Sequence, residues 1–327
     1  MLHTNFMMLA NVSRGFPTFP LHPQEKYQAR LKPPNHKFLA VYAPCASSID
    51  DSHSPPPKLA ENRVSIRPRK NRIFFLDANP ISYTGTTRSS KSFTYWLRLL
   101  LHEVTNGDPV IAVFDGSGCN NHRRALLPSY KSHKQISPLM NSPIHHPVFM
   151  TETLEKLNVP TVTVDGHEAD DVVATLTDKA VAKGYKVVIA SPDKDFKQLI
   201  SDDVQLVLPI SELKRWSFYT MKHYIAQYNC HPEVDLSLRC IIGDEVDNIP
   251  GIQSMVPGFG RKTALKLVKK HGSLEKLLKE ASVRTVAKQY AQDALTKHAD
   301  FLRRNYDVLA LKRDVDVHFD DHWLLHK

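Results

Sequence analysis

Residues 72–78 read RIFFLDA, a short run of apolar and aromatic residues that ends at an acidic one. Three later runs have the same form: PVIAVFD (109–115), PTVTVDG (160–166) and YKVVIASPD (185–193). Longer amphipathic segments, typical of helices, separate these runs near 93–104, 149–157 and 169–183. Strands that alternate with helices predict βαβ units and an α/β fold with a mainly parallel sheet.

Acidic residues follow all four predicted strands. Sites in open parallel sheets lie beyond the carboxyl ends of the strands, so these side chains should gather at one edge. A single Asp after a strand is usually only a turn residue, but four in succession are hard to explain as turns. They are Asp77, Asp115, Asp165 and Asp193.

Further carboxylates occur in two short motifs. HEADDVVA (167–174) places three of them directly before an apolar helical run, and helix capping accounts for one. GDEVDN (243–248) has two acids three residues apart, so one helical turn would set both on one face. Nine carboxylates are therefore candidate metal ligands: Asp77, Asp115, Glu168, Asp170, Asp171, Asp193, Asp195, Asp244 and Asp247.

Such a cluster predicts bound divalent cations. Carboxylates that crowd together raise one another's pKa and destabilise the fold unless positive charge compensates them. Oxygen ligands without a neighbouring His or Cys ligand favour Mg²⁺ or Mn²⁺ over zinc. Two such ions about 4 Å apart can activate a water and stabilise the leaving oxygen in phosphodiester cleavage.

Positive charge in the chain indicates a nucleic-acid partner. The net charge is +9 with a pI near 9.2, which favours polyanions, although solubility alone would also explain it. No Asp or Glu occurs from Gly116 to Thr151, and the basic residues there are Arg123, Arg124, Lys131 and Lys134. Beside a carboxylate cluster, this stretch is interpreted as a phosphate guide. Tyr130 either stacks on a base or belongs to the core.

Two functional classes are disfavoured by composition. No apolar run approaches the roughly 18–20 residues of a membrane span. The four cysteines are scattered without a CxxC pair, which argues against a disulfide framework or a zinc site and for a reducing compartment.

Downstream of residue 210, helical apolar spacing predominates. It predicts helices in 216–228, 233–243, 261–272 and 273–281, and a helix followed by a strand in 301–319. In GFGRKTALKL (258–267), Gly258 and Gly260 would let the backbone approach a phosphate, and the following helix start offers free amides.

Residues 1–68 have a different composition. Nine of the 22 prolines fall between Pro17 and Pro57, and Glu25 is the only acidic residue before Asp50. This composition favours a transit peptide for a mitochondrion or chloroplast. The alternative is a disordered tail, with the protein in the nucleus or cytoplasm.

Seven motifs, in their order along the chain, carry a family resemblance. They are FFLDAN, VFDG, HRR…SYKSHK, GHEADDVV, SPDKDFKQL, GDEVDNIPG and GFGRKTALKL. Together they resemble the 5′→3′ exonuclease and flap endonuclease family, and most of all the 5′-nuclease domain of bacterial DNA polymerase I, here in a stand-alone, plant organellar form. The resemblance runs from about Arg72 to about Lys279.

The resemblance implies a domain organisation and roles for individual residues. A PIN-like nuclease core would occupy 69–210, with a helical arch at about 116–150. A helical DNA-binding region would occupy 211–327, with a helix–turn–helix variant at about 240–280. The first metal group would be Asp77, Asp115, Glu168, Asp170 and Asp171, and the second would be Asp193, Asp195, Asp244 and Asp247. Catalytic contacts to the scissile phosphate would come from Arg123, Lys131 and Lys134. Contacts to DNA would come from Arg124, Tyr130, Gly258, Gly260, Arg261, Lys262, Thr263 and Lys266.

It further implies two Mg²⁺ ions, replaceable by Mn²⁺, and allows a K⁺ ion at the helix–turn–helix variant. The expected protein is a monomer that acts on DNA with 5′ ends, flaps or nicks. Two alternatives remain: a non-catalytic, structure-specific DNA-binding protein, and a nuclease for RNA or RNA–DNA hybrids. One departure from the family pattern is an insertion of about four residues between Gly251 and Gly258.

Overall fold

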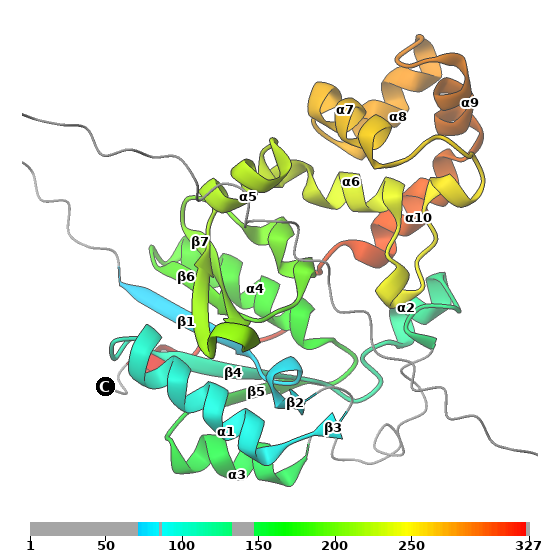
Figure 1. Cartoon of the computed structure of the whole chain (residues 1–327). Helices are drawn as coiled ribbons and strands as arrows, with labels where there is room; N and C mark the ends of the chain where they lie inside the picture. Colours follow the sequence, from blue (N-terminus) through cyan, green and yellow to red (C-terminus); the bar gives the residue numbers. More distant parts are fainter. Residues whose placement is uncertain (1–70, 85–86, 133–146, 325–327) are drawn as a thin grey trace, which may run out of the picture. The chain divides into compact units, whose positions relative to one another are not determined.

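The computed structural model describes residues 71–84, 87–132 and 147–324, and its ribbon is drawn in Figure 1. They all belong to one compact unit that spans Pro68–Lys327. The expectations for residues 1–68 and for Lys134, and part of the predicted arch, lie outside the described residues. Within the described part of the chain, no helix is long and apolar enough to cross a membrane.

A six-stranded sheet forms the centre of the α/β core, in the order β5-β4-β1-β6-β7-β8. Its strands are β1 (Arg72–Asp77), β4 (Val110–Asp115), β5 (Thr161–Val164), β6 (Lys186–Ala190), β7 (Val204–Ile210) and β8 (Arg215–Tyr219). The first five in the series are parallel, and β8 is antiparallel to β7. The four predicted strands are confirmed. Because β1 lies between β4 and β6, the strand order reverses there, and ligand sites form at such a point.

One expectation in this part of the chain is wrong. Residues 216–228 were expected to form one helix, but β8 takes the first of them and only α5 (Met221–Tyr228) is helical. Trp216 is buried, its ring packs edge-on against Trp96, and its Nε1 donates to the Trp96 carbonyl at 3.0 Å. Pairing with β7 and this burial override the local helical spacing.

Helices cover both faces of the sheet. Alternate residues of β1 point to opposite faces, so Ile73 and Phe75 pack with α4 (Ala169–Ala182). Phe74 and Leu76 pack on the other face with α1 (Ser90–Leu99) and α3 (Val148–Lys156). Figure 1 shows these two helices on that side of the sheet. Each face thus has its own apolar core, and the strand ends between them remain available for a site.

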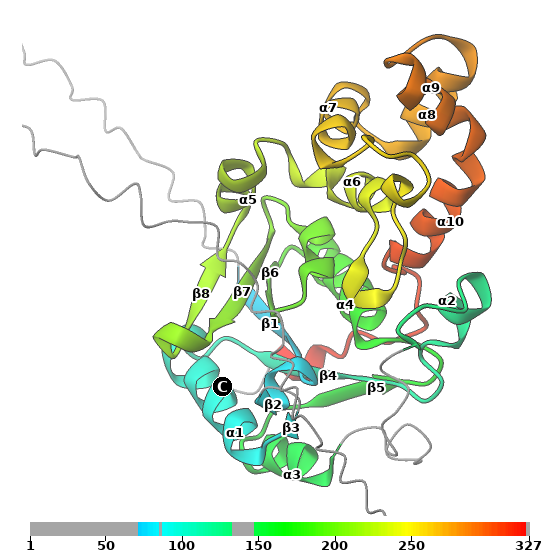
Figure 2. The ribbon, with the colours of Figure 1, turned by 45° about the vertical axis from the view of Figure 1, so that its right-hand side comes forward.

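The helical region follows the sheet. Its helices after α5 are α6 (Asp235–Ile242), α7 (Arg261–His271), α8 (Leu274–Val283), α9 (Gln289–Lys297) and α10 (Ala299–Leu309). Of these, α10 packs against α6, and Figure 1 and Figure 2 show the two side by side. The insertion between α6 and α7 is anchored by Ile252, which is fully buried and begins a 3₁₀ turn, Ile252–Ser254, while most of the inserted residues after it are exposed. Gly251 and Gly243 cross so closely that a Cβ on either would collide with backbone.

After α10 the chain forms a C-terminal strap, residues 310–319, that lies against α4. A strand was expected here, but these residues pair with no strand of the described sheet. Instead the Val315 amide donates to Thr175 Oγ1 at 3.2 Å, and Lys179 Nζ donates to the Val317 carbonyl at 2.6 Å. Val315, Val317 and Phe319 are buried in the α4 core, so burial against a helix replaces sheet pairing.

Candidate metal centre

Carboxylates converge where β1, β4 and β6 end. Asp77 is the last residue of β1, Asp115 is the last of β4, and Asp193 follows β6. Glu168 and Asp170 reach the same place from the start of α4, since Glu168 is its N-cap. Parallel strands that end together thus produce the predicted cluster from segments far apart in sequence.

Asp77 and Asp115 are held by hydrogen bonds from neutral donors. Ser191 Oγ donates to Asp77 at 2.8 Å. Asn79 Nδ2 and the Ala169 amide each donate to Asp115 at 2.8 Å. Burial raises the pKa of Asp77 and of Asp115, and nearby carboxylates raise both further. These donors fix the orientation of the carboxylates without supplying the missing positive charge.

Asp170 links the two predicted metal groups. Burial, and then the charges of Asp193 and Asp77, raise its pKa well above the ordinary value. Asp193 belongs to the predicted second group, so the two groups lie within electrostatic reach of each other. A cluster of buried acids with raised pKa values is matched to divalent cations, whose charge would favour the ionised forms.

The second group centres on three buried carboxylates. One oxygen each from Asp195, Asp244 and Asp247 lies within 4.8 Å of the others, which suits oxygen ligation of one hard cation. Arg239 Nη2 donates to Asp195 at 2.6 Å and to Asp244 at 2.7 Å, and Lys194 Nζ donates to Asp244 at 2.6 Å. Burial, with Asp193 nearby, still raises the pKa of Asp195 to about 8 despite Arg239.

Glu168 stands apart from its acidic neighbours because cations surround it. Lys131 Nζ forms an ion pair with it, Arg123 Nη1 donates to it at 2.5 Å, and the Tyr130 hydroxyl donates at 3.0 Å. Burial would raise the pKa of Glu168, but Lys131 and Arg123 outweigh burial and lower it. These cations therefore hold Glu168 in its ionised form.

Lys131 connects the base of the predicted arch to both groups. Its side chain pairs with Glu168 in the first group, and its backbone amide donates to the carbonyl of Asp247 in the second at 3.0 Å. Its φ of +47° is in the left-handed region, and it lies 5.0 Å from the ring centroid of Tyr130. Tyr130 itself is buried, so its ring lies in the core and not where a base would stack.

Arg123 was expected to contact the scissile phosphate and Asp171 to bind metal, but in the structure these two side chains bind each other. Arg123, on α2 (Asn121–Leu126), is only 4% exposed, and its two Nη atoms donate to both oxygens of Asp171 at 2.8 and 2.7 Å. Its Nε and Nη2 also donate to the carbonyls of Val308 and Ala310. Asp171 further accepts the Lys312 amide at 2.9 Å. The pair thus joins α2, α4 and the C-terminal strap, and leaves no donor of Arg123 for a phosphate.

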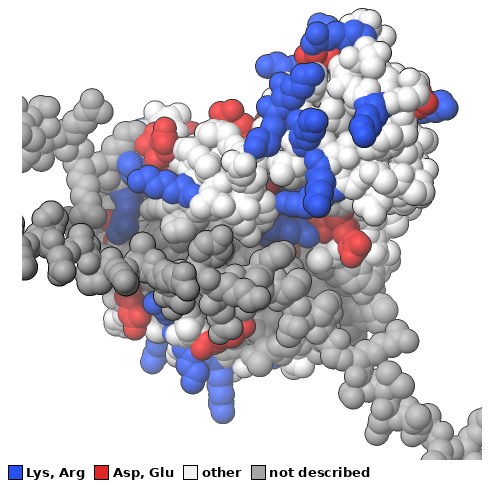
Figure 3. Space-filling view, turned by 45° about the horizontal axis from the view of Figure 1, so that its top comes forward, with Lys and Arg blue, Asp and Glu red and all other residues white. Residues whose placement is uncertain are grey.

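The predicted DNA-binding turn has open backbone and exposed charge. Gly258 has a φ of +90°, a backbone conformation that would strain any other residue. A Cβ added at this position would meet no atom within 4 Å, so the backbone there is open to a ligand. Gly260 caps α7 without a side-chain hydrogen bond. The exposed cations of α7 are Arg261, Lys262, Lys266, Lys269 and Lys270, and Figure 3 shows blue side chains along this part of the helical region. Thr263 and Arg124 are half-buried; Thr263 Oγ1 lies 3.2 Å from Tyr290 Oη, and Arg124 Nε donates to the Tyr130 carbonyl.

Family models match nearly all of the described chain. The 5′-3′ exonuclease N-terminal resolvase-like domain matches residues 71–229, and the 5′-3′ exonuclease C-terminal SAM fold matches residues 230–325. This chain belongs to the 5′-3′ exonuclease family. The family resemblance and the fold class inferred from sequence are thereby confirmed, whereas the plant organellar form stays a prediction.

Relatives and solved structures agree with this family. A 5′-3′ exonuclease of Aquifex aeolicus is 29% identical over 69% of this chain and 73% of its own length. DNA polymerase I of Thermus aquaticus is 30% identical over 77% of this chain but only 30% of the polymerase. In fold, the chain is similar to the T5 D15 protein co-crystallised with metal ions, with a TM-score of 0.58 and 22% identity over 74% of this chain and 90% of that one. A complex of bacteriophage T5 D15 flap endonuclease with DNA and metal ions gives 0.54 and 21% over 74% and 89%.

Two cations of this 5′-3′ exonuclease family member were missed by the sequence analysis. Arg239 and Lys194 lie within the second group, where metal ligands alone were expected. Arg239 precedes Asp244 by five residues on α6, in the otherwise apolar run LRCII. A lone Arg within a buried helix one turn before an acidic motif is a signal that could have been read, since such an Arg needs a carboxylate partner.

Proposed function

We propose that this chain is a Mg²⁺-dependent nuclease that hydrolyses DNA phosphodiesters from 5′ ends and at flaps or nicks. The observation that carries the proposal is the convergence of buried carboxylates with raised pKa values at the switch point of the sheet. Divalent cations would compensate the charge that these acids carry when they ionise. Membership of the 5′-3′ exonuclease family supports the 5′→3′ direction of hydrolysis. We expect Mn²⁺ to support the reaction in place of Mg²⁺.

The residues divide into two ligand groups. Asp77, Asp115, Glu168 and Asp170 would hold one ion, and Asp193, Asp195, Asp244 and Asp247 the other, partly through water because Mg²⁺ keeps several waters. When bound, two such ions supply an activated water and stabilise the leaving oxygen. Lys131, whose ammonium pairs with Glu168, would contact the phosphate that is hydrolysed. Arg239 and Lys194 would limit repulsion within the second group.

Duplex DNA would be held away from this chemistry. The α7 start, with Gly258, Gly260 and exposed cations, offers amides and charge to backbone phosphates. The K⁺ ion at this turn, the monomeric state and the use of RNA–DNA hybrids stay predictions.

The test is a set of 5′-labelled substrates incubated with Mg²⁺, Mn²⁺ or EDTA: a 5′ flap, a nicked duplex, and a duplex whose 5′ segment is RNA. We expect cleavage of both DNA substrates with either metal and none in EDTA. The Asp170→Asn variant should bind the flap in Ca²⁺ as the wild type does but cleave it at least about a hundredfold more slowly, because several kcal/mol of metal stabilisation are lost. Undiminished cutting in EDTA would refute the metal mechanism, and cutting of the RNA segment alone would favour the RNA-directed alternative.

A further inference from the structure

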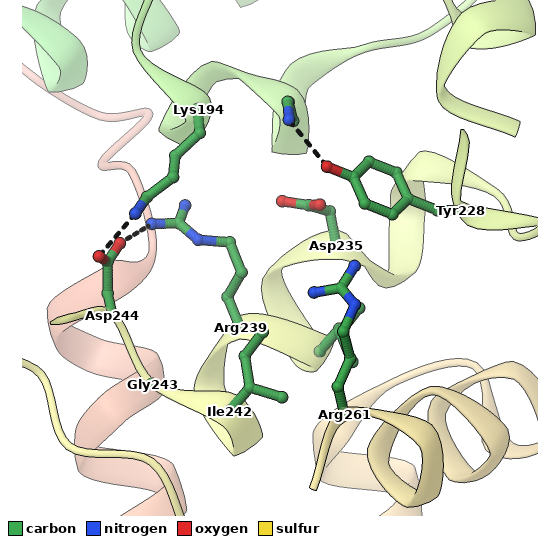
Figure 4. Close-up of a pocket in the computed structure, with 10 residues that line it drawn as sticks. Lys194, Tyr228, Asp235, Arg239, Ile242, Gly243, Asp244 and Arg261 are labelled. Atoms are coloured by element: carbon green, nitrogen blue, oxygen red, sulfur yellow. Dashed lines mark hydrogen bonds and ion pairs between the residues drawn. The ribbon is translucent and has the colours of Figure 1, made fainter. Parts of the chain in front are cut away.

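A cavity of about 200 Å³ lies between the second carboxylate group and the start of α7. One ordered water needs about 10–15 Å³ of such space, so a tetrahedral oxyanion fits easily. Its polar lining side chains are those of Lys194, Lys197, Tyr228, Asp235, Arg239, Asp244 and Arg261. Figure 4 shows several of these side chains around one open space, although they come from the turn after β6 and from α5, α6 and α7.

Two of the cations lack a carboxylate partner. Lys197 Nζ donates to the Tyr228 hydroxyl at 3.0 Å and lies 5.2 Å from the centroid of its ring. The Arg261 guanidinium lies 5.1 Å from the same centroid. Among the described residues, neither forms an ion pair with an acid. The Tyr228 ring therefore lies close to two cations. Asp235 interacts electrostatically with both but contacts neither, and with Lys194 and Arg239 also at the cavity wall the cations there outnumber the acids, so a bound anion would be stabilised.

Buried polar atoms at the cavity wall also lack partners. Arg239 Nη2 holds Asp195 and Asp244, but its Nη1 is buried without a hydrogen-bond partner in the described structure. Asp235 Oδ2 is also buried without a hydrogen-bond partner in the described structure, while Asp235 Oδ1 accepts from the Tyr224 hydroxyl at 2.7 Å. Burial raises the pKa of Asp235, although the Tyr224 hydroxyl and the cations Arg239, Lys197 and Arg261 act to lower it. A buried donor of a charged group is costly to leave unpaired, so Arg239 Nη1 favours a ligand that offers it an acceptor.

We propose that this cavity is a phosphate subsite, filled by a backbone phosphate of the bound DNA strand adjacent to the one being hydrolysed. The proposal rests on the nuclease function above, because Asp244 belongs both to the cavity wall and to the second carboxylate group. It gives Lys194, Lys197 and Arg261 a common ligand. It also separates Arg261 from its neighbour Lys262, which is exposed and does not line the cavity.

The test places one neutral methylphosphonate linkage at successive positions around the cleavage site of a 5′-flap duplex. Affinity is measured in Ca²⁺ for the wild type, Arg261→Gln and Lys197→Gln, with Lys262→Gln as the matched control. In the wild type, one linkage should weaken binding about tenfold, as loss of a charge-assisted contact would. In the cavity variants Arg261→Gln and Lys197→Gln, the same linkage should not weaken binding any further. In Lys262→Gln, it should still weaken binding about tenfold. Arg261 is exposed, so its variant should fold.

The other outcomes each overturn the proposal. If the wild type binds and cuts the flap but every linkage effect survives in both cavity variants, the cavity binds no backbone phosphate. If free 5′-dAMP competes with DNA in the wild type but not in Arg261→Gln, while no linkage responds, the cavity holds a released mononucleotide instead. A wild type that neither binds nor cuts flap DNA would refute the nuclease function, and this inference with it.

Discussion

At the scale of single residues, two adjacent acids of α4 have opposite surroundings. Asp170 faces other carboxylates, whereas Asp171 is saturated by Arg123 and the Lys312 amide. Consecutive helical residues point in directions about 100° apart, so only one of the two can face the cluster. The motif HEADD identified the acids, but its spacing cannot tell which one turns toward the strand ends. That choice depends on α2 and the C-terminal strap, which are distant in sequence.

Asparagine at these two positions should therefore have different effects. Asp170→Asn should remove cleavage while leaving thermal stability in EDTA equal or higher, because it removes like-charge repulsion. Asp171→Asn should lower stability by about 3 kcal/mol, since it breaks a buried ion pair, and should keep most of the activity per folded molecule. Denaturant unfolding and single-turnover cleavage measure the two effects. Equal stability loss in both variants would contradict this division.

The raised pKa values predict that metal binding releases protons. In the metal-free protein Asp195, with a pKa of about 8, is largely protonated at pH 7, and Asp77, Asp115 and Asp170 are shifted in the same direction. These folded-state values exceed the unfolded ones, so the metal-free protein should lose stability as pH rises from about 4 toward 8. Ca²⁺ affinity should rise over the same range, because ligation needs the ionised forms.

Titration calorimetry of Ca²⁺ at pH 7, in two buffers with different ionisation enthalpies, measures this release. The observed enthalpies should differ between the buffers, and less so in Asp195→Asn. Identical enthalpies in the two buffers for the wild type would mean that the acids are already ionised.

At the scale of elements, the apolar spacing of the sequence predicted correctly those strands and helices whose structure depends mainly on that spacing. The strands of RIFFLDA, PVIAVFD, PTVTVDG and YKVVIASPD and the helix of 169–182 are specified by their own apolar spacing, and all are present. Two elements were misjudged because their partners decide their structure. RWSFY becomes β8 through pairing with β7, and 310–319 becomes a strap because it packs on α4. Arg123 was assigned to the scissile phosphate from the family resemblance and from local charge, and neither reveals that its side chain is buried.

Lys131, at the base of the predicted arch, and Lys262, on α7, should contribute to cleavage in different ways. Lys131→Ala should slow single-turnover cleavage at saturating enzyme by about a hundredfold or more, because its charge lies beside the cluster and gains value as negative charge develops. Lys262→Ala, on exposed α7, should mainly weaken binding and reduce its salt slope by about one. The measurement is a pair of enzyme titrations on a 5′-flap duplex at two salt concentrations. A change in affinity alone for Lys131→Ala, or in rate alone for Lys262→Ala, would contradict this.

At the scale of the whole molecule, composition separates residues 1–68 from the described unit. This segment is rich in proline and poor in acids, and we propose that it delivers the protein to a mitochondrion or chloroplast. A fluorescent fusion of residues 1–70 should co-localise with an organelle marker in cells. The matched control is the same fusion with Arg14, Lys26, Arg30, Lys32 and Lys37 replaced by Glu, which should remain diffuse. A diffuse signal from the unaltered fusion would contradict the proposal.

The C-terminal strap also bears on when the enzyme becomes competent during its synthesis. The hydrogen bond from Val315 to Thr175 joins residues 140 positions apart. Ribosomes add roughly 5–20 residues per second, so α4 leaves the ribosome on the order of ten seconds before the segment that secures it. In that interval Asp171 and Arg123 lack the carbonyls and amide supplied by residues 308–312. A nascent chain would thus carry its acidic helix only loosely fixed, and cutting of nucleic acid would begin after the helical region had been made.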